Sequence, residues 1–407
     1  MRISTKTIYE NATSQLNSLQ SQMARTQTQL ATNRRMLTAA DDPIASARAL
    51  EVTQSQSLNT QYATNRSNAN SSLSLVESAL TNGTDLIMDV QTLVVQAGNG
   101  TLAKSQRLQI ATEIEARMQD LLGIANTADG SGGYLFSGYK GSTMPFVQTD
   151  SGATYQGDQG QRKLQVGSSR SIAISDSGSA IFENNRTGNG SYQTRMVDGN
   201  TGGAVAGSGS VTDASQLTGH NYTLQFKVAG TPAVTTYSVT DTSASPQRAV
   251  LSDEPYVAGK QIAFEGTSFT ITGAPADGDK FEVKPSEKES IFTTMTNLVN
   301  ALRDSGEDNT SLATLSNKLS TASEGLKSSL DNMLTVRASV GSRMKELDYL
   351  EDQGSDLGVQ YAGTLSKLQD LDIVKAISDY ATQQTTLEAA QKSFKTMSGL
   401  SLFNYIG

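Results

Sequence analysis

The sequence predicts a mainly α-helical fold with a β insert. Long terminal helices are expected to form an antiparallel, coiled-coil-like bundle, and a small antiparallel β domain is expected between the two helical halves. Three observations predict this fold. Apolar residues recur at helical spacing over about the first 130 residues, they alternate in steps of two through the middle of the chain, and helical spacing returns after Pro285.

A heptad pattern marks residues 1–40, which we predict to form an N-terminal assembly helix. One line of residues at intervals of seven consists of Tyr9, Leu16, Met23, Leu30 and Leu37. The adjacent line contains Leu19 but continues with the polar residues Thr26 and Asn33. Because this second line is weak, the helix should be marginally stable alone and should need neighbours to bury its apolar face.

A helix break and restart is predicted at Asp41-Asp42-Pro43. An Asp at the N-cap followed by Pro at the first helical position is a typical helix start. Residues 41–138 then show two helical patterns separated by Gly98-Asn99-Gly100, a sequence that favours a turn. We therefore predict a helical hairpin that forms the N-terminal half of a rod domain.

Residues 139–285 are predicted to form the β domain. Tyr222, Leu224 and Phe226 alternate with polar residues, which is the pattern of a half-buried strand. The segment 186–210 is rich in Gly, Asn and Ser, and we interpret it as a mobile loop or a long excursion within the domain.

The C-terminal part of the chain is predicted to be helical again. Residues 286–360 should form the C-terminal half of the rod domain, and residues 361–407 a C-terminal assembly helix. The apolar stripes at the two ends of the chain together predict an assembly interface. Its residues are Leu16, Leu19, Met23, Leu30, Leu37, Ile373, Ala376, Tyr380, Leu387, Phe394 and Met397.

Opposite charges favour pairing of the two ends. Residues 1–40 contain five basic residues and one acidic residue, a net charge of +4, whereas residues 341–380 contain four basic and eight acidic residues, a net charge of −4. Each exposed pair contributes only about 0.2–1 kcal/mol, so apolar burial must supply the rest. That burial can occur inside one subunit or between stacked subunits, and the pattern alone leaves both possibilities open.

The composition argues against several classes of function. A formal net charge of −8 makes nucleic acid and anionic membranes unlikely partners. We expect no membrane span, because no run of about 18 apolar residues is present, and the N-terminal residues lack the apolar stretch of a signal peptide. The absence of Cys excludes disulfides, thiolate metal sites and cysteine nucleophiles.

The sequence also offers no convincing catalytic, metal or cofactor site, so we predict a protein that is not an enzyme. His220 is the single histidine and has no catalytic motif nearby. Asp253-Glu254 and Asp277-Gly278-Asp279 lie in turn-like contexts without a complete calcium-loop pattern. A structural role is favoured for all of them.

Two motifs resemble a known family. The segment Leu30–Ala45, which contains Asp41, Asp42 and Pro43, is similar to the N-terminal signature of flagellin-like proteins, and its Pro43 variant is closer to the subfamily of hook-associated proteins at the hook-filament junction. The run Gly133–Tyr139, with Tyr134, Phe136 and Gly138, resembles that subfamily's passage from helices into the β domain. Residues 336–343 and the stretch after Leu368 also look like this subfamily.

The resemblance implies a structural subunit of the bacterial flagellum that adapts the hook to the filament. Its implied location is extracellular, after export without a cleaved signal peptide through the flagellar secretion apparatus. The implied partners are copies of itself in a helical ring, another hook-associated protein on the hook side, flagellin on the filament side, and an export chaperone at the C-terminal region. The β domain should face outward, and the terminal segments should become ordered on assembly.

Two other interpretations remain open at the level of sequence. One is a filament flagellin, which the Tyr134 to Tyr139 motif and the Pro43 variant disfavour. The other is an adhesin or glycan-binding module displayed on helical rods, in which the β domain would carry the binding function.

Overall fold

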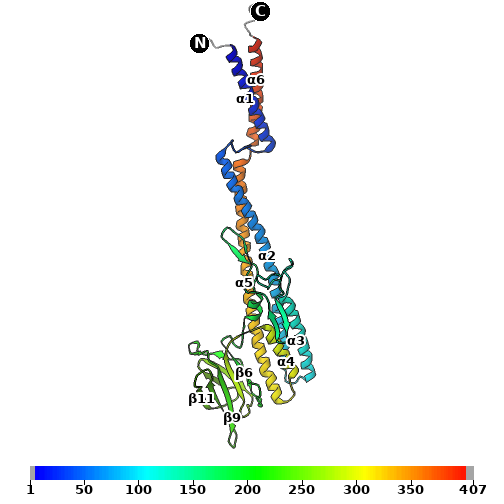
Figure 1. The fold of residues 1–407 in the computed structure, drawn as a ribbon, viewed down its shortest axis with the longest axis vertical. Coiled ribbons are helices and arrows are strands. Elements are labelled where there is room, and N and C mark those ends of the chain that lie inside the picture. The colour runs from blue at the N-terminus through cyan, green and yellow to red at the C-terminus, as the bar shows by residue number, and fades with distance from the viewer. Residues whose placement is uncertain (1–4, 400–407) are drawn as a thin grey trace, which may run out of the picture. The chain divides into compact units, whose positions relative to one another are not determined.

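The computed structural model describes residues 5–399, and the chain divides into two units (Figure 1). The terminal unit comprises the described residues up to Asn65 together with those from Tyr349 onward, and the central unit runs from Arg66 to Asp348. Each unit therefore contains helices from both halves of the chain. The outermost residues of the predicted segments 1–40 and 361–407 lie outside the described residues.

Six long helices account for the helical halves of the described chain. They are α1 (Thr5–Thr32), α2 (Pro43–Ala97), α3 (Lys104–Ala125), α4 (Ile291–Asp304), α5 (Asn309–Gln369) and α6 (Ile373–Gly399). A β region lies between α3 and α4 in the sequence, so the predicted fold class is confirmed. None of the helices in residues 5–399 combines the length and the apolarity needed to cross a bilayer.

The predicted N-terminal helix is too long by several residues. The heptad pattern extends to Leu37, but α1 ends at Thr32 and Leu37 lies in a turn. Asn33 has a φ of 53°, a left-handed conformation that Asn adopts more readily than most residues and that ends a helix. The restart at Pro43 is confirmed, and the Asp42 side chain accepts a hydrogen bond of 3.0 Å from Ala45 N.

The helices of the central bundle bury their apolar faces against one another. Buried residues from α2, α3, α4 and α5 include Leu73, Leu80, Ile87, Ile114, Leu121, Phe292, Met295, Leu326 and Met333. Gly83 permits close packing, because a Cβ atom there would lie 2.9 Å from Met333 Sδ. Arg337 on α5 donates to Glu77 on α2 across 2.6 Å. This bundle therefore has a conventional apolar core.

Short hairpins and turns connect the bundle to the rest of the β region. The strand β1 (Phe146–Thr149) pairs with β2 (Gly152–Tyr155), and β3 (Lys163–Gln165) pairs with β4 (Ser171–Ala173). A π-helical turn follows at Ser179–Glu183. The pair of β5 (Asn185–Arg186) and β15 (Lys288–Glu289) then forms a two-stranded neck. The chain enters and leaves the remaining β structure through this neck.

Two antiparallel sheets lie beyond the neck. The first has the strand order β11 (Arg248–Pro255), β10 (Val234–Asp241), β9 (Tyr222–Ala229), β14 (Lys280–Pro285) and β6 (Tyr192–Met196). The second consists of β12 (Gln261–Phe264), β13 (Thr267–Thr272) and β7 (Val205–Ala206), with β8 (Ser210–Val211) also paired to β13. A 3-10 turn at Ala214–Gln216 precedes β9.

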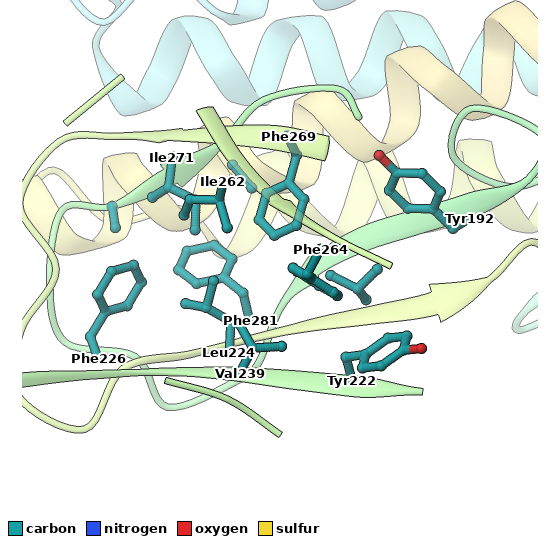
Figure 2. Close-up of a cluster of buried hydrophobic side chains, with 13 residues drawn as sticks. Tyr192, Tyr222, Leu224, Phe226, Val239, Ile262, Phe264, Phe269, Ile271 and Phe281 are labelled. Carbon is teal, nitrogen blue, oxygen red and sulfur yellow. The ribbon is translucent and has the colours of Figure 1, made fainter. Parts of the chain in front are cut away.

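Alternating residues of these strands form a single apolar core. Figure 2 shows Leu224, Phe281 and Val239 of one sheet lying with Ile262 and Phe269 of the other. The register places Phe281 opposite Leu224 and Ile262 opposite Phe269. The period of two seen in the sequence therefore corresponds to one buried face per strand.

The interpretation of residues 186–210 as a mobile loop is wrong, because this segment contains β6 and β7. Tyr192 is buried, and its hydroxyl lies 3.0 Å from Ser210 O and 2.6 Å from Ser268 O. Gly209 makes room for that ring, since a Cβ atom there would come within 2.4 Å of the Tyr192 hydroxyl. Gly209 thus serves close packing here rather than mobility.

Candidate assembly interface

The helices at the two ends of the chain pack side by side in the terminal unit (Figure 1). The Tyr9 ring near the start of α1 lies 4.9 Å, centroid to centroid, from the Phe394 ring near the end of α6. The helices are therefore antiparallel, as the charge pattern and the seams predicted. Ala376 and Leu387 are buried, while the other predicted residues inside this pair are half-buried. These are Leu16, Leu19, Met23, Leu30, Tyr380 and Phe394.

Polar residues weaken the seam between α1 and α6. Thr26 is buried and donates its hydroxyl to Gln22 O in its own helix at 3.1 Å. The Oε1 atom of Gln383 is buried and has no hydrogen-bond partner among the described residues. An unsatisfied buried acceptor costs roughly 1–3 kcal/mol. A single chain therefore gains little stability from this pair of helices.

Two of the predicted interface residues remain exposed in the single chain. Ile373 is 50% exposed and Met397 is 43% exposed. Their neighbours on α6, Val374 and Ile377, are 81% and 55% exposed. The start of α6 therefore carries two apolar faces, of which only the face that contains Ala376 is covered.

The turn between α1 and α2 is held by its aspartates. The Asp41 side chain accepts hydrogen bonds from Leu37 N at 2.8 Å and Thr38 N at 2.9 Å. Arg25 lies 2.8 Å from the same carboxylate. The backbone hydrogen bonds from Thr38 and Leu37, with the charge of Arg25, hold the pKa of Asp41 below its ordinary value. The family motif therefore forms a closed, charged turn.

The same turn is joined to the break between α5 and α6. Arg35 N donates to Gln369 O at 2.8 Å, and the Arg35 guanidinium reaches Leu368 O at 2.9 Å and Asp42 at 3.3 Å. Leu371 N donates to Asn33 O at 3.3 Å. Sequence reasoning counted Arg25 and Arg35 only as charge. Both arginines precede the pair Asp41-Asp42 in the sequence, and this arrangement was the available signal for these contacts.

The second motif forms part of an aromatic cluster in the central unit. Phe136 is fully buried, with its ring 5.7 Å from that of Phe182, and Phe146 lies 5.4 Å from Phe182 and 5.2 Å from Phe292. Tyr155 places its hydroxyl 2.9 Å from Phe136 O, and burial raises the pKa of that hydroxyl to about 12. The cluster therefore packs against the start of α4.

Gly138 and Tyr134 complete this motif. Gly138 has a φ of 72°, and a Cβ atom there would lie 2.3 Å from Asp158 Oδ1, so only glycine fits both the conformation and the space. The Asp158 carboxylate accepts from Tyr139 N at 2.9 Å. Tyr134 is half-buried, and its carbonyl oxygen accepts from Arg162 at 3.4 Å.

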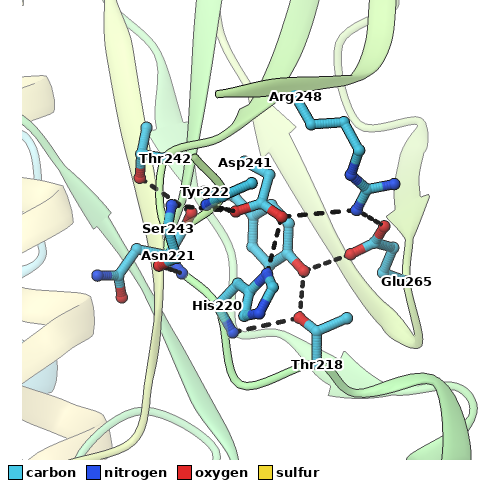
Figure 3. Close-up of polar contacts among 10 residues, drawn as sticks. Thr218, His220, Asn221, Tyr222, Asp241, Thr242, Ser243, Arg248 and Glu265 are labelled. Carbon is cyan, nitrogen blue, oxygen red and sulfur yellow. Dashed lines mark hydrogen bonds and ion pairs between the residues drawn. The ribbon is translucent and has the colours of Figure 1, made fainter. Parts of the chain in front are cut away.

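His220 lies in a polar network at one end of the β domain (Figure 3). Its Nδ1 atom is 2.8 Å from the buried Asp241 carboxylate, and Arg248 lies 3.5 Å from the same group. The hydrogen bond with His220 is the largest cause that holds the pKa of Asp241 below its ordinary value. Glu265 contacts both Arg248 and the Tyr222 hydroxyl. The network ties the ends of β9 and β10 to the turn between β12 and β13.

The Asp277-Gly278-Asp279 turn has structural partners as well, whereas the turn predicted at Asp253-Glu254 is wrong, because both residues lie in β11. Asp279 accepts from Thr201 N and Ala276 N, each at 2.8 Å, and Asp277 accepts from Val228 N at 2.9 Å. Within residues 5–399, no group of three or more His, Asp or Glu side chains is placed to hold a metal ion.

Comparison with protein families gives two matches. Residues 3–141 match the bacterial flagellin N-terminal helical region. Residues 197–285, which contain most of the two-sheet β domain, match the D2-like domain of flagellar hook-associated protein 1. The sequence alone shows no usable resemblance for the β domain.

The curated relatives match over nearly their full length. Flagellar hook-associated protein 3 of Escherichia coli K12 is 30% identical over 407 residues, with 99% of each chain covered. The protein of the same name from Salmonella typhimurium LT2 is 29% identical over 403 residues, again with 99% of each covered.

Two solved structures of this kind have the same fold. Hook-associated protein 3 from Legionella pneumophila is 31% identical, with a TM-score of 0.73, and the match covers 78% of this chain and 98% of that one. FlgL from Xanthomonas campestris is 30% identical, with a TM-score of 0.71, and the match covers 77% and 99% of the two chains.

The aromatic cluster generates a prediction about stability. Replacing Phe136 with Ala should lower the free energy of unfolding of the central unit by about 3–5 kcal/mol, because the fully buried ring leaves a cavity beside Phe182. Urea denaturation followed by circular dichroism measures this change. The control is Val147→Ala on β1, where the side chain is 46% exposed and the expected change is below about 0.5 kcal/mol. Equal effects of the two substitutions would contradict the packing role.

The Asp41 turn generates a prediction about pH. Because the pKa of Asp41 is lower in the folded chain than its ordinary value of 3.8, the carboxylate stabilises the turn above pH 3.8 and loses this effect as the pH falls through the lowered pKa. The amide proton shifts of Leu37 and Thr38, measured by NMR, should therefore titrate in acid. Asp41→Asn keeps an acceptor oxygen but should abolish this titration. An unchanged titration in that variant would exclude Asp41 as its source.

Proposed function

The chain belongs to the flagellar hook-associated protein 3 family, and on this premise we propose that it joins the flagellar hook to the filament by assembling through its terminal unit. It is a structural protein of the bacterial flagellum, as the family is. Its helices supply the assembly surface, and no reaction chemistry is assigned to it.

The observation that carries this proposal is the distribution of apolar residues in the terminal unit. Among its described residues, four hydrophobic side chains are buried, and three of these are alanines: Ala45, Ala49, Ala376 and Leu387. Twelve large hydrophobic residues are exposed in the same unit. They are Ile8, Tyr9, Ile44, Leu50, Leu58, Tyr349, Leu357, Val359, Ile373, Val374, Ile377 and Met397. Exposed apolar residues at this density mark an interaction surface.

Assembly explains how such a unit becomes stable. Fixing the backbone of a residue costs about 1–2 kcal/mol, and burial of a few alanines cannot offset that cost over two helices. Covering an exposed Ile, Leu or Val side chain with a neighbouring subunit contributes about 1.5–3 kcal/mol. The terminal helices therefore become ordered when copies stack against one another, as the interface residues predicted from the sequence require.

The two family matches support the proposed partners. The N-terminal match to flagellin supports contact with flagellin on the filament side, because helices of the same kind can continue one helical packing. The match of residues 197–285 to a domain of hook-associated protein 1 supports a second hook-associated protein as the neighbour on the hook side. We further propose a helical ring of copies outside the cell, and an export chaperone that covers the C-terminal region before secretion without a cleaved signal peptide.

In this proposal the assembly segments 1–40 and 361–407 act together with the adjoining ends of the rod segments, up to Asn65 and from Tyr349, which belong to the same terminal unit. The rest of residues 41–138 and 286–360 forms the rod, and residues 139–285 face outward. The neck of β5 and β15 gives the outward domain a narrow attachment. The chain enters the domain after Arg186 and leaves it before Lys288, and these two residues are paired directly.

Truncation tests the proposal. Removing residues 1–40, or residues 365–407, should abolish attachment of filaments to hooks, because each deletion leaves the other terminal helix without its partner. Electron microscopy of cells that carry the truncated gene measures attachment. The purified variants should retain the circular dichroism of the β domain. Filaments that remain attached in both truncations would overturn the proposal.

Deletion of the β domain is the matched control. Removing residues 190–285 leaves Gly188, Asn189 and Ser286 as a short loop between Thr187 and Glu287, whose backbone groups are hydrogen-bonded at 2.9 Å. Gly188 already has a φ of 60°, which suits a tight turn. This variant should still attach filaments. An adhesin would instead lose surface binding while attachment persisted, and that result would reveal a second function in the β domain.

A further inference from the structure

The two-sheet β domain meets helix α5 at a small polar contact as well as at the neck. Asn317 on α5 is buried. Its Nδ2 atom donates to Ala204 O at 2.9 Å, and its Oδ1 atom accepts from Ala206 N at 2.9 Å. Both ends of one side-chain amide therefore bind the backbone of β7.

This contact completes the outer edge of β7, which is the last strand of the second sheet. Gly203 N and Gly207 N each donate at 2.8 Å to carbonyl groups on the side of β13. Because alternate residues of a strand direct their backbone groups to opposite sides, those of Ala204 and Ala206 point away from β13. A side-chain amide has the same donor and acceptor as a peptide group, so Asn317 takes the place of a neighbouring strand.

Two further polar contacts flank Asn317 along α5. The Thr310 hydroxyl donates to Thr201 O at 2.8 Å. The Ser208 side chain hydrogen-bonds to Glu324, and burial raises the pKa of that carboxyl above its ordinary value. Residues on both sides of β7 therefore lie against α5 between Thr310 and Glu324.

The apolar core of the β domain is closed within the domain itself. All the described members of its cluster, including the partly buried ones, lie between Tyr192 and Val283. A cavity of about 360 Å³ lies between β6 and the neck on one side and α4 and α5 on the other. Met196, Leu298 and Asn317 are among the residues of its wall. Polar contacts rather than a shared apolar core therefore hold the domain against α5.

The base of the neck is fixed to the same helix by a different residue. Asn332 on α5 donates through Nδ2 to Ile181 O at 2.9 Å and to Asn185 Oδ1 at 3.2 Å. Asn185 belongs to β5, which pairs with β15 over only two residues. The domain thus has an anchored base, a short two-stranded link, and one separate contact at Asn317.

We propose that Asn317 is a latch, which holds the β domain in one orientation on α5, and that the domain turns on the neck of β5 and β15 when the two Asn317 hydrogen bonds break. The latch lies in the central unit and goes beyond the proposed assembly of the terminal unit. It sets the direction in which the β domain projects from the rod.

Distances between two spin labels test the latch. The natural chain contains no Cys, so Val234→Cys and Lys327→Cys would carry the labels alone. Val234 is 57% exposed in the hairpin of β9 and β10, at the end of the sheet away from the neck, and Lys327 is exposed on α5. Double electron–electron resonance should give one narrow distance distribution. Asn317→Leu, which removes both hydrogen bonds, should broaden it and add a second population.

Asn300→Leu on α4 is the matched control. Asn300 lines the same cavity, but its side chain makes no hydrogen bond to the β domain within residues 5–399. The distance distribution should therefore stay narrow in this variant. Equal broadening in Asn300→Leu and Asn317→Leu would contradict a specific latch.

Hydrogen exchange separates release of the domain from its unfolding. In Asn317→Leu the amide of Ala206 should lose protection, whereas amides of β9 and of the central bundle should keep theirs. A distribution as narrow in Asn317→Leu as in the natural chain would overturn the latch. A broad distribution in the natural chain would overturn it as well, and so would lost protection in β9 or the bundle, which would make Asn317 a residue that the fold itself requires.

Discussion

The structure depends on one constraint, which is that the terminal unit cannot bury enough apolar surface by itself. The seam between α1 and α6 contains the buried Thr26 and an unpaired amide oxygen of Gln383, and its largest buried hydrophobic residue is Leu387. At the same time, residues as apolar as Ile44 and Val374 remain more than four-fifths exposed. A subunit with this distribution is incomplete as a monomer, and its neighbours supply the missing core.

Local polar contacts provide the geometry that this weak core cannot. The Asp41 turn and the backbone bonds of Arg35 and Leu371 join the break between α1 and α2 to the break between α5 and α6. The apolar faces next to these breaks therefore keep a defined position relative to each other. The central unit has no such dependence, because its helices and the Phe136 cluster enclose their own core. The β domain, attached through a two-stranded neck, folds around a separate core.

The sequence predicted features that depend on local chemistry. The Asp42 cap, the helix start at Pro43 and the alternation in β9 all follow from residues close together in the chain. It failed where distant residues decide the outcome. Tyr192 belongs to a strand because Ser268 and Gly209 accommodate its ring, and a single sequence does not show such contacts. Periodicity also cannot tell whether Ile373 faces its own chain or another subunit, since both produce the same spacing.

Hydrogen exchange followed by mass spectrometry, on the isolated monomer and on assembled flagella, tests the central claim most directly. Amides of α1 and α6 should exchange much faster than those of the central bundle in the monomer, and they should become strongly protected after assembly. Amides of the central bundle should be protected in both states. Strong protection of α1 and α6 in the isolated monomer, equal to that of the central bundle, would contradict the account.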